Sequence, residues 1–496
     1  VRDVARALGM SYSQGDRLSK LIPQGKQGFH VKLKQALEES PELKLAYVQE
    51  EESKKVIDVA MKLEGLVRHA STHAAGLMIG DQDLTEYVPL QREAKAGKIV
   101  TQYDMYCLDL NAVSNNEGVG LTKFDFLGLR NLTIIDNAQH FVEARTGEKI
   151  DIHAIPLDDP KTFKLLSDAK TIGVFQLESK GMQRLAKDLQ PSRLSDITAM
   201  VALYRPGPME LIPSFVEGKR DSKKIKYLHP DLEPILSETY GVLVYQEQVM
   251  GIAASIAGYT MSEADGLRMA MGKKKIKLME IHKKKFVDQA QEKGYSKELA
   301  QKIFGFMEKF AAYGFNKPHS ASYGLIAYWT AYMKANYPVE YMAAVLSADL
   351  QGAAGAQKEA KVFQGIEETR SMGIAVAQAD INSSGTDFSI EGDTIRFGLN
   401  SIKSVGKSAI DSILQAREEH LFIGLRDFLS RVDLSKANKR TVENLIKAGA
   451  FDAFGTRKAL IEYYPKAVAE AQSHKKQFDS GQFGLFSSQS KEYLTD

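Results

Sequence analysis

The chain contains 496 residues, 44% of them apolar and 26% charged, which is typical of a soluble globular protein. This length exceeds one ordinary hydrophobic core, so we expect roughly three or four structural units. The single cysteine, Cys107, excludes an internal disulfide, and no apolar run is long enough to span a bilayer, so we predict a cytoplasmic protein without membrane segments. The net charge of +2 says little about partners.

Residues 1–68 are predicted to be mostly helical, with one apolar face around Val4 and another around Val56. Helical spacing is already present at Val1, without an initiator methionine or a cap, so we expect the interior part of a larger protein. Beyond this region, short apolar segments predict strands, at 76–80, at 99–103 and from Thr122 onward, that form a small α+β unit through about residue 130.

A helix is predicted to follow and to end at Gly147, and the region from 150 to about 385 is predicted to be chiefly helical. One of its helices ends at Gly258. The chain becomes strand-like again near 381–398, and two compact helical motifs and a polar tail complete it.

The segment Gly120–Leu129 combines a predicted strand, a glycine turn and the start of a helix. Side chains alternate along a strand, so Lys123 and Asp125 share one face, and Phe124 and Phe126 share the other. A charged pair in so apolar a segment needs a partner, because desolvated charges are costly. Two interpretations stay open: a structural ion pair, or an acidic metal ligand beside a phosphate-facing lysine.

Basic residues are clustered although the net charge is small. Eight lysines or arginines and one acid lie between Arg268 and Lys285, and a second basic run spans 219–226. Either run alone is commonly a solvated face. Two runs in one helical region, with Arg205 and Lys317 nearby in sequence, favour a polyanion such as nucleic acid or a triphosphate.

Acidic residues do not complete a two-metal site. Phosphoryl transfer to a hydroxyl commonly uses two divalent ions held by several carboxylates, and Asp125 alone cannot hold both. The pair Asp81 and Asp83 lies in a predicted turn and has ordinary turn composition. Part of any two-metal site is therefore expected outside this chain.

Histidine spacing supports no zinc site, and the phosphate-binding P-loop pattern does not occur. His73 precedes an apolar strand and is predicted to be structural. His319 lies in a predicted loop between Lys317 and Ser320 and is a candidate for a polar site.

Two motifs lie near the C-terminus. Residues 402–410 are predicted to form a helix, a tight turn at Gly406 and a second helix, either a plain helical hairpin or one whose turn amides accept a DNA phosphate. In the tail, the apolar pair Leu485 and Phe486 is either incidental or part of a docking peptide.

Taken together, the motifs resemble the bacterial replicative DNA polymerase III alpha subunit, of the C family of polymerases. Six segments carry this resemblance in order along nearly the whole chain: Thr122–Leu129, Val174–Ser179, Ala202–Pro208, Tyr245–Met250, Met271–Lys275 and Tyr313–Ser320.

The resemblance implies a multidomain, mostly α fold with four regions. Residues 1–68 are expected to be a helical thumb and 69–130 the second half of an α+β palm of polymerase-beta-like nucleotidyltransferase type. Residues 131–385 are expected to be helical fingers, and 386–496 a helix-hairpin-helix, duplex-binding and clamp-binding region.

The resemblance also implies roles for individual residues. Asp125 corresponds to a catalytic aspartate, the one ligand in this chain of a Mg²⁺ pair. Nucleotide binding is assigned to Lys123, Arg205, Arg268, Lys273, Lys274, Lys317, His319 and Ser320. DNA binding is assigned to Lys275, Lys277, Lys403, Gly406 and Lys407. Sliding-clamp binding is assigned to Gln482, Leu485 and Phe486.

Some positions depart from the family pattern. The first two catalytic aspartates and a phosphoesterase-like domain are expected upstream of Val1. Met269 stands where an arginine is usual, which weakens one triphosphate contact, and Ser404 stands where the hairpin has its first glycine. The OB-fold domain expected after the clamp motif is not in this sequence.

The expected function is template-directed DNA synthesis, by deoxynucleotidyl transfer to a primer 3′ end. Its expected partners are primer-template DNA, deoxynucleoside triphosphates, the sliding clamp, and proofreading and clamp-loader subunits. The alternative is that this chain alone is a non-catalytic fragment that binds DNA and the clamp.

Overall fold

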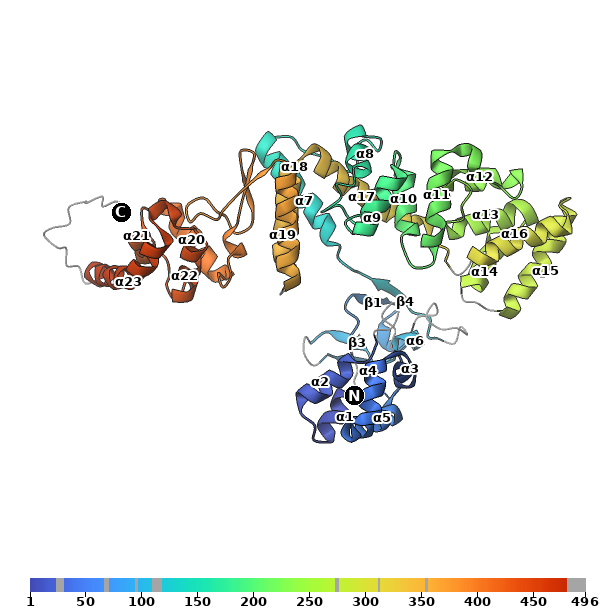
Figure 1. Ribbon diagram of the computed structural model, residues 1–496, viewed down its shortest axis with the longest axis horizontal. Helices are drawn as coiled ribbons and strands as arrows, with labels where there is room; N and C mark the ends of the chain where they lie inside the picture. Colours follow the sequence, from blue (N-terminus) through green and yellow to red (C-terminus); the bar gives the residue numbers. More distant parts are fainter. Residues whose placement is uncertain are drawn as a thin grey trace. The chain divides into compact units, whose positions relative to one another are not determined.

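The computed structural model describes residues 1–23, 31–66, 71–93, 97–108, 118–272, 276–310, 313–352 and 356–479. Two compact units divide the chain, Val1–Gly128 and Leu129–Asp496 (Figure 1). Within the residues described, helices predominate in both units and three small sheets occur. None of the described helices combines the length and apolarity needed to cross a membrane.

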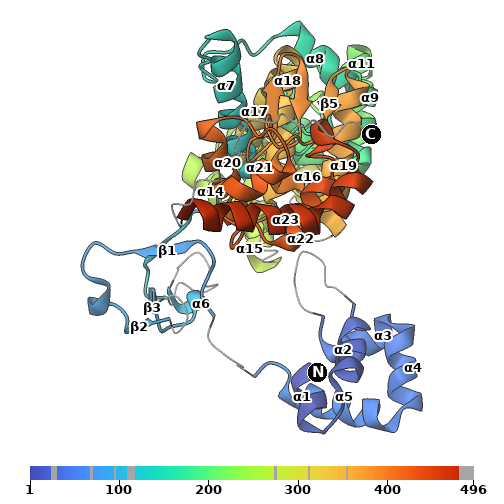
Figure 2. The same ribbon diagram turned by 90° about the vertical axis from the view of Figure 1, so that its left-hand side faces the viewer.

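The first unit begins with five short helices, drawn in blue in Figure 2. They are α1 (Arg2–Ala7), α2 (Tyr12–Lys20), α3 (Leu33–Glu39), α4 (Pro41–Gln49) and α5 (Glu51–Leu63). Ser11 begins α2 through a capping box with Gln14, which satisfies amides that the first turn leaves unpaired. Val4 and Val56 pack in one core with Leu18, so the predicted apolar faces are confirmed.

Two antiparallel sheets of two strands each follow in this unit. Strand β1 (Gly76–Ile79) pairs with β4 (Thr122–Asp125), and β2 (Leu90–Arg92) pairs with β3 (Ile99–Thr101). The three predicted strands are confirmed, whereas β2 was not predicted. Two short helices lie between the strands, η2 (Leu84–Glu86) and α6 (Met105–Leu108).

The second unit begins with a long helical region. Its α-helices up to the next sheet are α7 (Arg130–Thr146), α8 (Pro160–Ser167), α9 (Lys180–Leu189), α10 (Leu194–Leu203), α11 (Ile212–Arg220), α12 (Glu233–Leu236), α13 (Gln246–Ala257), α14 (Met261–Gly272), α15 (Ile276–Glu292), α16 (Lys297–Phe310), α17 (Lys317–Asn336), α18 (Pro338–Gln351) and α19 (Ala356–Ser371). Gly147 and Gly258 end α7 and α13 with φ of 74° and 71°, as predicted, because glycine adopts this left-handed geometry without strain.

Helix α17 lies at the centre of the first helical group, where it packs against α7, α8, α10 and α18 (Figure 1). Helices α13 to α16 form a second group around a core that includes Ile252, Phe286 and Phe304. Four 3₁₀ turns connect parts of these groups: η3 (Pro208–Leu211), η4 (Ser222–Lys224), η5 (Pro230–Leu232) and η6 (Ser237–Thr239).

A three-stranded sheet precedes the last helices. Its strands are β5 (Ala375–Ala377), β6 (Ser389–Glu391) and β7 (Thr394–Arg396), in the order β5-β7-β6. The elements after it are η7 (Leu399–Ser401), α20 (Lys407–Glu419), α21 (Leu425–Arg431), α22 (Lys439–Lys447), η8 (Asp452–Phe454) and α23 (Arg457–Asp479). Phe422, Phe428 and Phe451 pack edge to face in their shared core.

The structure corrects two sequence predictions here. The predicted first helix of the 402–410 hairpin does not form: the 3₁₀ turn η7 ends at Ser401, and residues 402–406 turn directly into α20. The predicted loop 313–320 ends earlier than expected, because Asn316 caps α17 through the His319 amide and Pro318 suits the first helical turn.

Candidate functional site

Lys123 and Asp125 lie on β4 and form an ion pair. Lys123 Nζ is 2.8 Å from Asp125 Oδ1 and 2.9 Å from Oδ2. The hydrogen bond from Lys123 holds the pKa of the Asp125 carboxyl below its usual range, so this group is ionised at neutral pH. The Asp125 side chain is 43% exposed, against 16% for Lys123. The ion pair expected by the structural interpretation therefore exists. Its carboxylate also faces solvent, as the metal-ligand interpretation requires.

The apolar side chains beside this pair are exposed. Phe124 and Phe126 are 49% and 68% exposed, and their rings stack with centroids 6.3 Å apart. Leu77, which pairs with Phe124 across the sheet, is 53% exposed. The charges meet the partner that the sequence requires, since each is the other's partner, and the apolar residues on the opposite face of β4 face solvent.

His73 holds the beginning of β1. Its Nδ1 accepts hydrogen bonds from the amides of Gly76 (2.6 Å) and Ala75 (3.2 Å), so Nδ1 carries no proton. The same atom lies 3.7 Å from Asp125 Oδ1, a contact that in this tautomer is no ion pair. The predicted structural role of His73 agrees with these contacts.

The ligand chemistry of Asp125 fits magnesium, which prefers carboxylate oxygens. In the part of the chain that the structure describes, no three or more His, Cys, Asp or Glu side chains lie close enough together to hold a metal ion. Asp81 accepts a hydrogen bond from the Tyr87 hydroxyl, and Asp83 caps η2 through Thr85, so both have the predicted turn role. Asp125 therefore fits one position in a metal site.

In the second unit, several predicted nucleotide-binding residues meet around the segment 313–316. Arg205 donates to the Tyr313 carbonyl, and its guanidinium lies 4.5 Å from the centre of the Phe315 ring. Burial lowers the pKa of Arg205, which still stays charged because an arginine loses its proton only at extreme pH. The His319 ring stacks on Tyr323 at 4.3 Å.

Arg268 reaches the same segment through a residue that the sequence did not single out. Arg268 Nη1 donates to Gln246 Oε1 at 3.3 Å, and Gln246 Nε2 donates to the Gly314 carbonyl at 3.1 Å. The backbone amide of Gln246 also donates to the Phe315 carbonyl at 2.9 Å. Its only sequence signal was its place in the Tyr245–Met250 motif.

Lys317 and Ser320 belong to the first turns of α17 rather than to a loop. Lys317 Nζ is 2.5 Å from Glu238 Oε2 and 5.6 Å from the Tyr245 ring centre. Ser320 is fully buried, and its hydroxyl donates to the Thr198 carbonyl at 2.6 Å. Ser320 therefore joins α17 to α10, and its hydroxyl is used within the fold.

The two basic runs differ in structure. In the second run, Lys219 binds the buried Asp196, Arg220 donates to a backbone carbonyl, and Lys224 pairs with Glu217. Burial acts to raise the pKa of Asp196, but the hydrogen bond from Lys219 holds it below the usual range. Run 219–226 is therefore largely used within the fold, and its prediction as a polyanion site is not supported.

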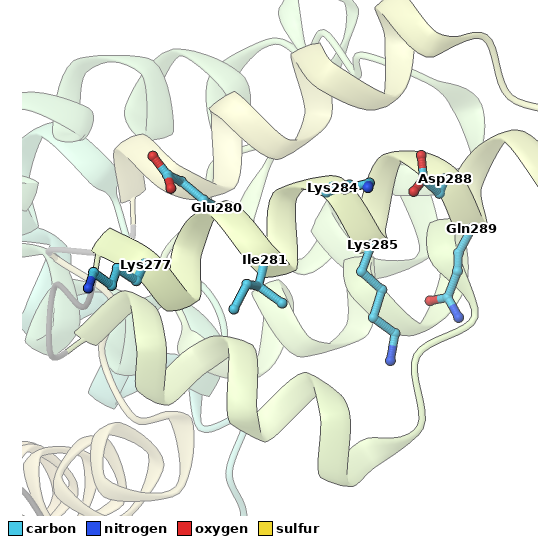
Figure 3. A pocket seen from close by; sticks show the side chains of 7 residues that line it. All are labelled: Lys277, Glu280, Ile281, Lys284, Lys285, Asp288 and Gln289. Carbon is cyan, nitrogen blue, oxygen red and sulfur yellow. The ribbon is translucent and has the colours of Figure 1, made fainter.

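The first run continues on the exposed side of α15. Lys277 is exposed and lines a shallow pocket of about 530 Å³, together with Ile281 and Lys285 (Figure 3). Lys285 is already paired with Glu263, at 2.5 Å. All lining residues belong to this one helix, so the pocket is a trough along its surface. Lys273, Lys274 and Lys275 lie outside the described residues.

The hairpin residues lie at the beginning of α20. Lys403, Gly406 and Lys407 are all exposed, and Gly406 is the residue that precedes the helix. The first amides of a helix have no acceptor within it, so they can bind an anion. Gln482, Leu485 and Phe486 of the predicted clamp motif lie outside the described residues.

Models of known protein families match three segments of the chain. Residues 1–128 match the model of the bacterial DNA polymerase III alpha NTPase domain. Residues 131–294 match the finger domain of the same subunit, and 373–460 match a helix-hairpin-helix motif. The first match ends where the first compact unit ends.

Curated relatives are named DNA polymerase III subunit alpha. The protein of Thermus aquaticus is 46% identical over 492 residues, which cover 98% of this chain and 39% of the relative. Those of Chlamydia pneumoniae and Aquifex aeolicus are 44% and 43% identical, over 98% and 91% of this chain and 38% and 40% of their own lengths. The chain thus spans about two fifths of the length of these relatives. It belongs to the family of bacterial DNA polymerase III alpha subunits.

Proposed function

We propose that this chain carries the nucleotide-binding fingers, part of the catalytic palm and the duplex-binding hairpin of a bacterial replicative DNA polymerase. The whole protein extends a primer 3′ end from deoxynucleoside triphosphates. The observation that carries this proposal is the exposed, ionised Asp125 beside Lys123, in a chain that matches polymerase III alpha relatives along nearly its whole length. Residues 1–68, 69–130, 131–385 and 386–496 are proposed as thumb, partial palm, fingers and C-terminal binding region.

Asp125 is proposed as one ligand of a Mg²⁺ pair, with the other carboxylates supplied from outside the described residues. Two such ions, when bound, activate the primer hydroxyl and neutralise charge on the triphosphate. Asp125 contributes an oxygen ligand that stays ionised at neutral pH, because its pKa is lowered. Lys123 orients that carboxylate and places a positive charge where phosphate oxygens arrive.

Nucleotide binding in the fingers is proposed for Arg205, Arg268, Lys317 and His319, with Lys273 and Lys274 from the basic run. Arg205 and the His319 ring contact the segment 313–316 directly, Arg268 reaches it through Gln246, and Lys317 follows it in the chain. Cationic and aromatic groups of this kind suit a triphosphate and a base. Ser320 then acts indirectly, by fixing the first turns of α17.

DNA binding is proposed for Lys275 and Lys277 on the fingers and for Lys403, Gly406 and Lys407 at the hairpin. Gln482, Leu485 and Phe486 are proposed to dock on the sliding clamp, which tethers the polymerase to DNA. Proofreading and clamp-loader subunits are proposed as further partners, in a cytoplasmic replication complex.

Primer extension with Mg²⁺ tests the catalytic part of the proposal. In the full-length protein, Asp125→Asn should lower the rate about a hundredfold or more, because several kcal/mol of transition-state stabilisation depend on the metals. The matched control is Asp136→Asn, which neutralises an exposed carboxylate on α7 and should leave the rate unchanged. An active Asp125→Asn protein would contradict the proposal.

The second candidate function is a non-catalytic DNA- and clamp-binding fragment. It is favoured by the single carboxylate at the candidate metal site within the described ranges. If the 496-residue chain alone extends a primer, and Asp125→Asn abolishes this, the second candidate is refuted. An inactive chain that nevertheless binds duplex DNA supports it for the chain alone.

Clamp docking is tested by replacing both Leu485 and Phe486 with alanine. Loss of two apolar anchors should weaken clamp binding about tenfold or more, as measured by surface plasmon resonance. Short, distributive synthesis without the clamp should be nearly unchanged, because tethering alters effective concentration and not chemistry. Equal loss of both activities would refute the tethering role.

A further inference from the structure

The turn before α20 has an unusual backbone conformation. Ser404 has φ of 65°, in the left-handed region that glycine adopts readily and that residues with a Cβ atom adopt at a cost. Nothing in serine itself favours this conformation over the extended or helical ones. Other contacts must therefore hold the turn between Lys403 and Gly406.

Two side chains of α22 supply such contacts. Asn444 Nδ2 donates to the Lys403 carbonyl at 2.8 Å, and Thr441 Oγ1 donates to the Ser404 carbonyl at 3.1 Å. Both are more than 35 positions further along the chain, so the contacts are tertiary. Thr441 is only 3% exposed, and α22 is anchored by buried Leu445.

These two bonds determine which way the turn amides point. In a trans peptide the C=O and the following N–H point in opposite directions. Because the Lys403 carbonyl faces α22, the Ser404 amide faces away from it. The Val405 amide is used inside the turn, where it donates to the Ile402 carbonyl at 3.2 Å. Ser404, Gly406, Lys407 and Ser408 are exposed residues, so their amides belong to the accessible part of the hairpin, next to Lys403, whereas the Ala409 amide already donates to the Gly406 carbonyl.

We propose that Asn444 and Thr441 are positioning residues for the contact between this hairpin and a phosphate of duplex DNA. They hold Ser404 in the left-handed conformation, a role that a glycine would make unnecessary. The inference rests on the proposed duplex binding by the hairpin and adds the residues that shape it. Neither side chain is required to touch DNA.

Binding of a fluorescein-labelled duplex by the full 496-residue chain, measured by anisotropy over a series of salt concentrations, tests this role. The variant Asn444→Ala combined with Thr441→Val should bind about tenfold more weakly, since each lost hydrogen bond accounts for a factor of a few. The dependence of affinity on salt should become shallower, because a phosphate contact is lost.

Ser404→Gly separates positioning from general damage to the fold. Added to the weakened variant, it should restore most of the affinity, because glycine adopts the left-handed conformation without the two tethers. The matched control is Ser430→Ala, which removes a hydroxyl-to-carbonyl hydrogen bond of the same region at 2.8 Å and should leave binding unchanged.

Unchanged affinity in the variant, or failure of Ser404→Gly to restore it, would overturn the positioning role. If the double variant does not fold by circular dichroism, Asn444→Ala alone, with and without Ser404→Gly, carries the same comparison, because Asn444 is only half-buried. A wild-type chain that binds no duplex would overturn the proposed duplex binding together with this inference. Wild-type binding with an unaffected Asn444→Ala variant would overturn the inference alone.

Discussion

Lys123 and Asp125 lie two positions apart on β4, so the strand itself places both charges on one face. The lysine is mostly covered and the carboxylate is half exposed. This arrangement keeps the carboxyl ionised without enclosing it. Such a group is ready to bind a cation, and the same ion pair stabilises the sheet.

Removal of the lysine charge tests this coupling. Lys123→Met should raise the pKa of Asp125 toward its ordinary value, because the hydrogen bond and the charge that lower it are lost. A lowered carboxyl pKa stabilises the fold above the unfolded pKa of about 3.9, and this contribution disappears as the pH falls through the folded value. The variant should therefore be less stable than wild type at neutral pH and equally stable in acid.

The measurement is an NMR titration of the Asp125 carboxyl carbon. Thermal unfolding of the variant and the wild type is followed at neutral and at acidic pH. Lys164→Met is the control, since Lys164 forms an exposed pair with Asp168 at 3.1 Å on α8 and should not affect Asp125. An unchanged Asp125 pKa in Lys123→Met would contradict the assignment.

At the scale of elements, the cluster of residues around the segment 313–316 depends on how closely α10, α13 and this segment approach one another. The segment pairs with Tyr245 by a single parallel bridge, and Gln246 extends this contact to Arg268. Gly207, which follows α10, has φ of 100° and lies against the Tyr313 ring. A Cβ atom there would be 2.3 Å from Tyr313 Cδ1.

Gly207→Ala should consequently lower the free energy of unfolding by about 2–3 kcal/mol, through backbone strain and overpacking. It should also raise the Kd for a deoxynucleoside triphosphate, because Tyr313 and its contact with Arg205 are displaced. The matched control is Gly305→Ala in the middle of α16, where a Cβ atom meets nothing within 4 Å. That change should stabilise the protein by about 0.5–1 kcal/mol, because alanine favours helix. Chemical denaturation and nucleotide titration measure both effects.

At the scale of the molecule, the first unit exposes an apolar sheet face. It consists of Leu77, Ile79, Phe124 and Phe126, each at least 43% exposed. Contiguous exposed apolar side chains are typical of a surface that is covered in the assembled protein, and we expect that for this face. If the proposed palm is correct, its sheet continues through other segments of the full-length protein and covers this face.

The 496-residue chain should therefore bind a hydrophobic dye at this face. Leu77→Ser with Phe126→Ser should remove most of the dye fluorescence, whereas Leu132→Ser, at a 46% exposed leucine of α7, should change it little. The full-length protein should show a much weaker signal than the chain. Equal fluorescence of the chain and the full-length protein would contradict this account.

The sequence by itself determined the helical character, the strands β1, β3 and β4, and the helix ends at Gly147 and Gly258. These depend on local periodicity, capping and glycine geometry, which neighbouring residues define. It also determined the family, because motifs of specific composition recur in order along the chain.

Only the tertiary structure decided which polar and charged residues remain accessible. Lys219 and Ser320 are used within the fold by partners far away in sequence, Asp196 and Thr198, whereas Lys277 and Lys403 are exposed. The hydrogen bond between Gln246 and Arg268 is likewise a tertiary contact that the local sequence does not indicate. Local patterns report the chemistry of a side chain, but burial and pairing depend on residues brought together by folding.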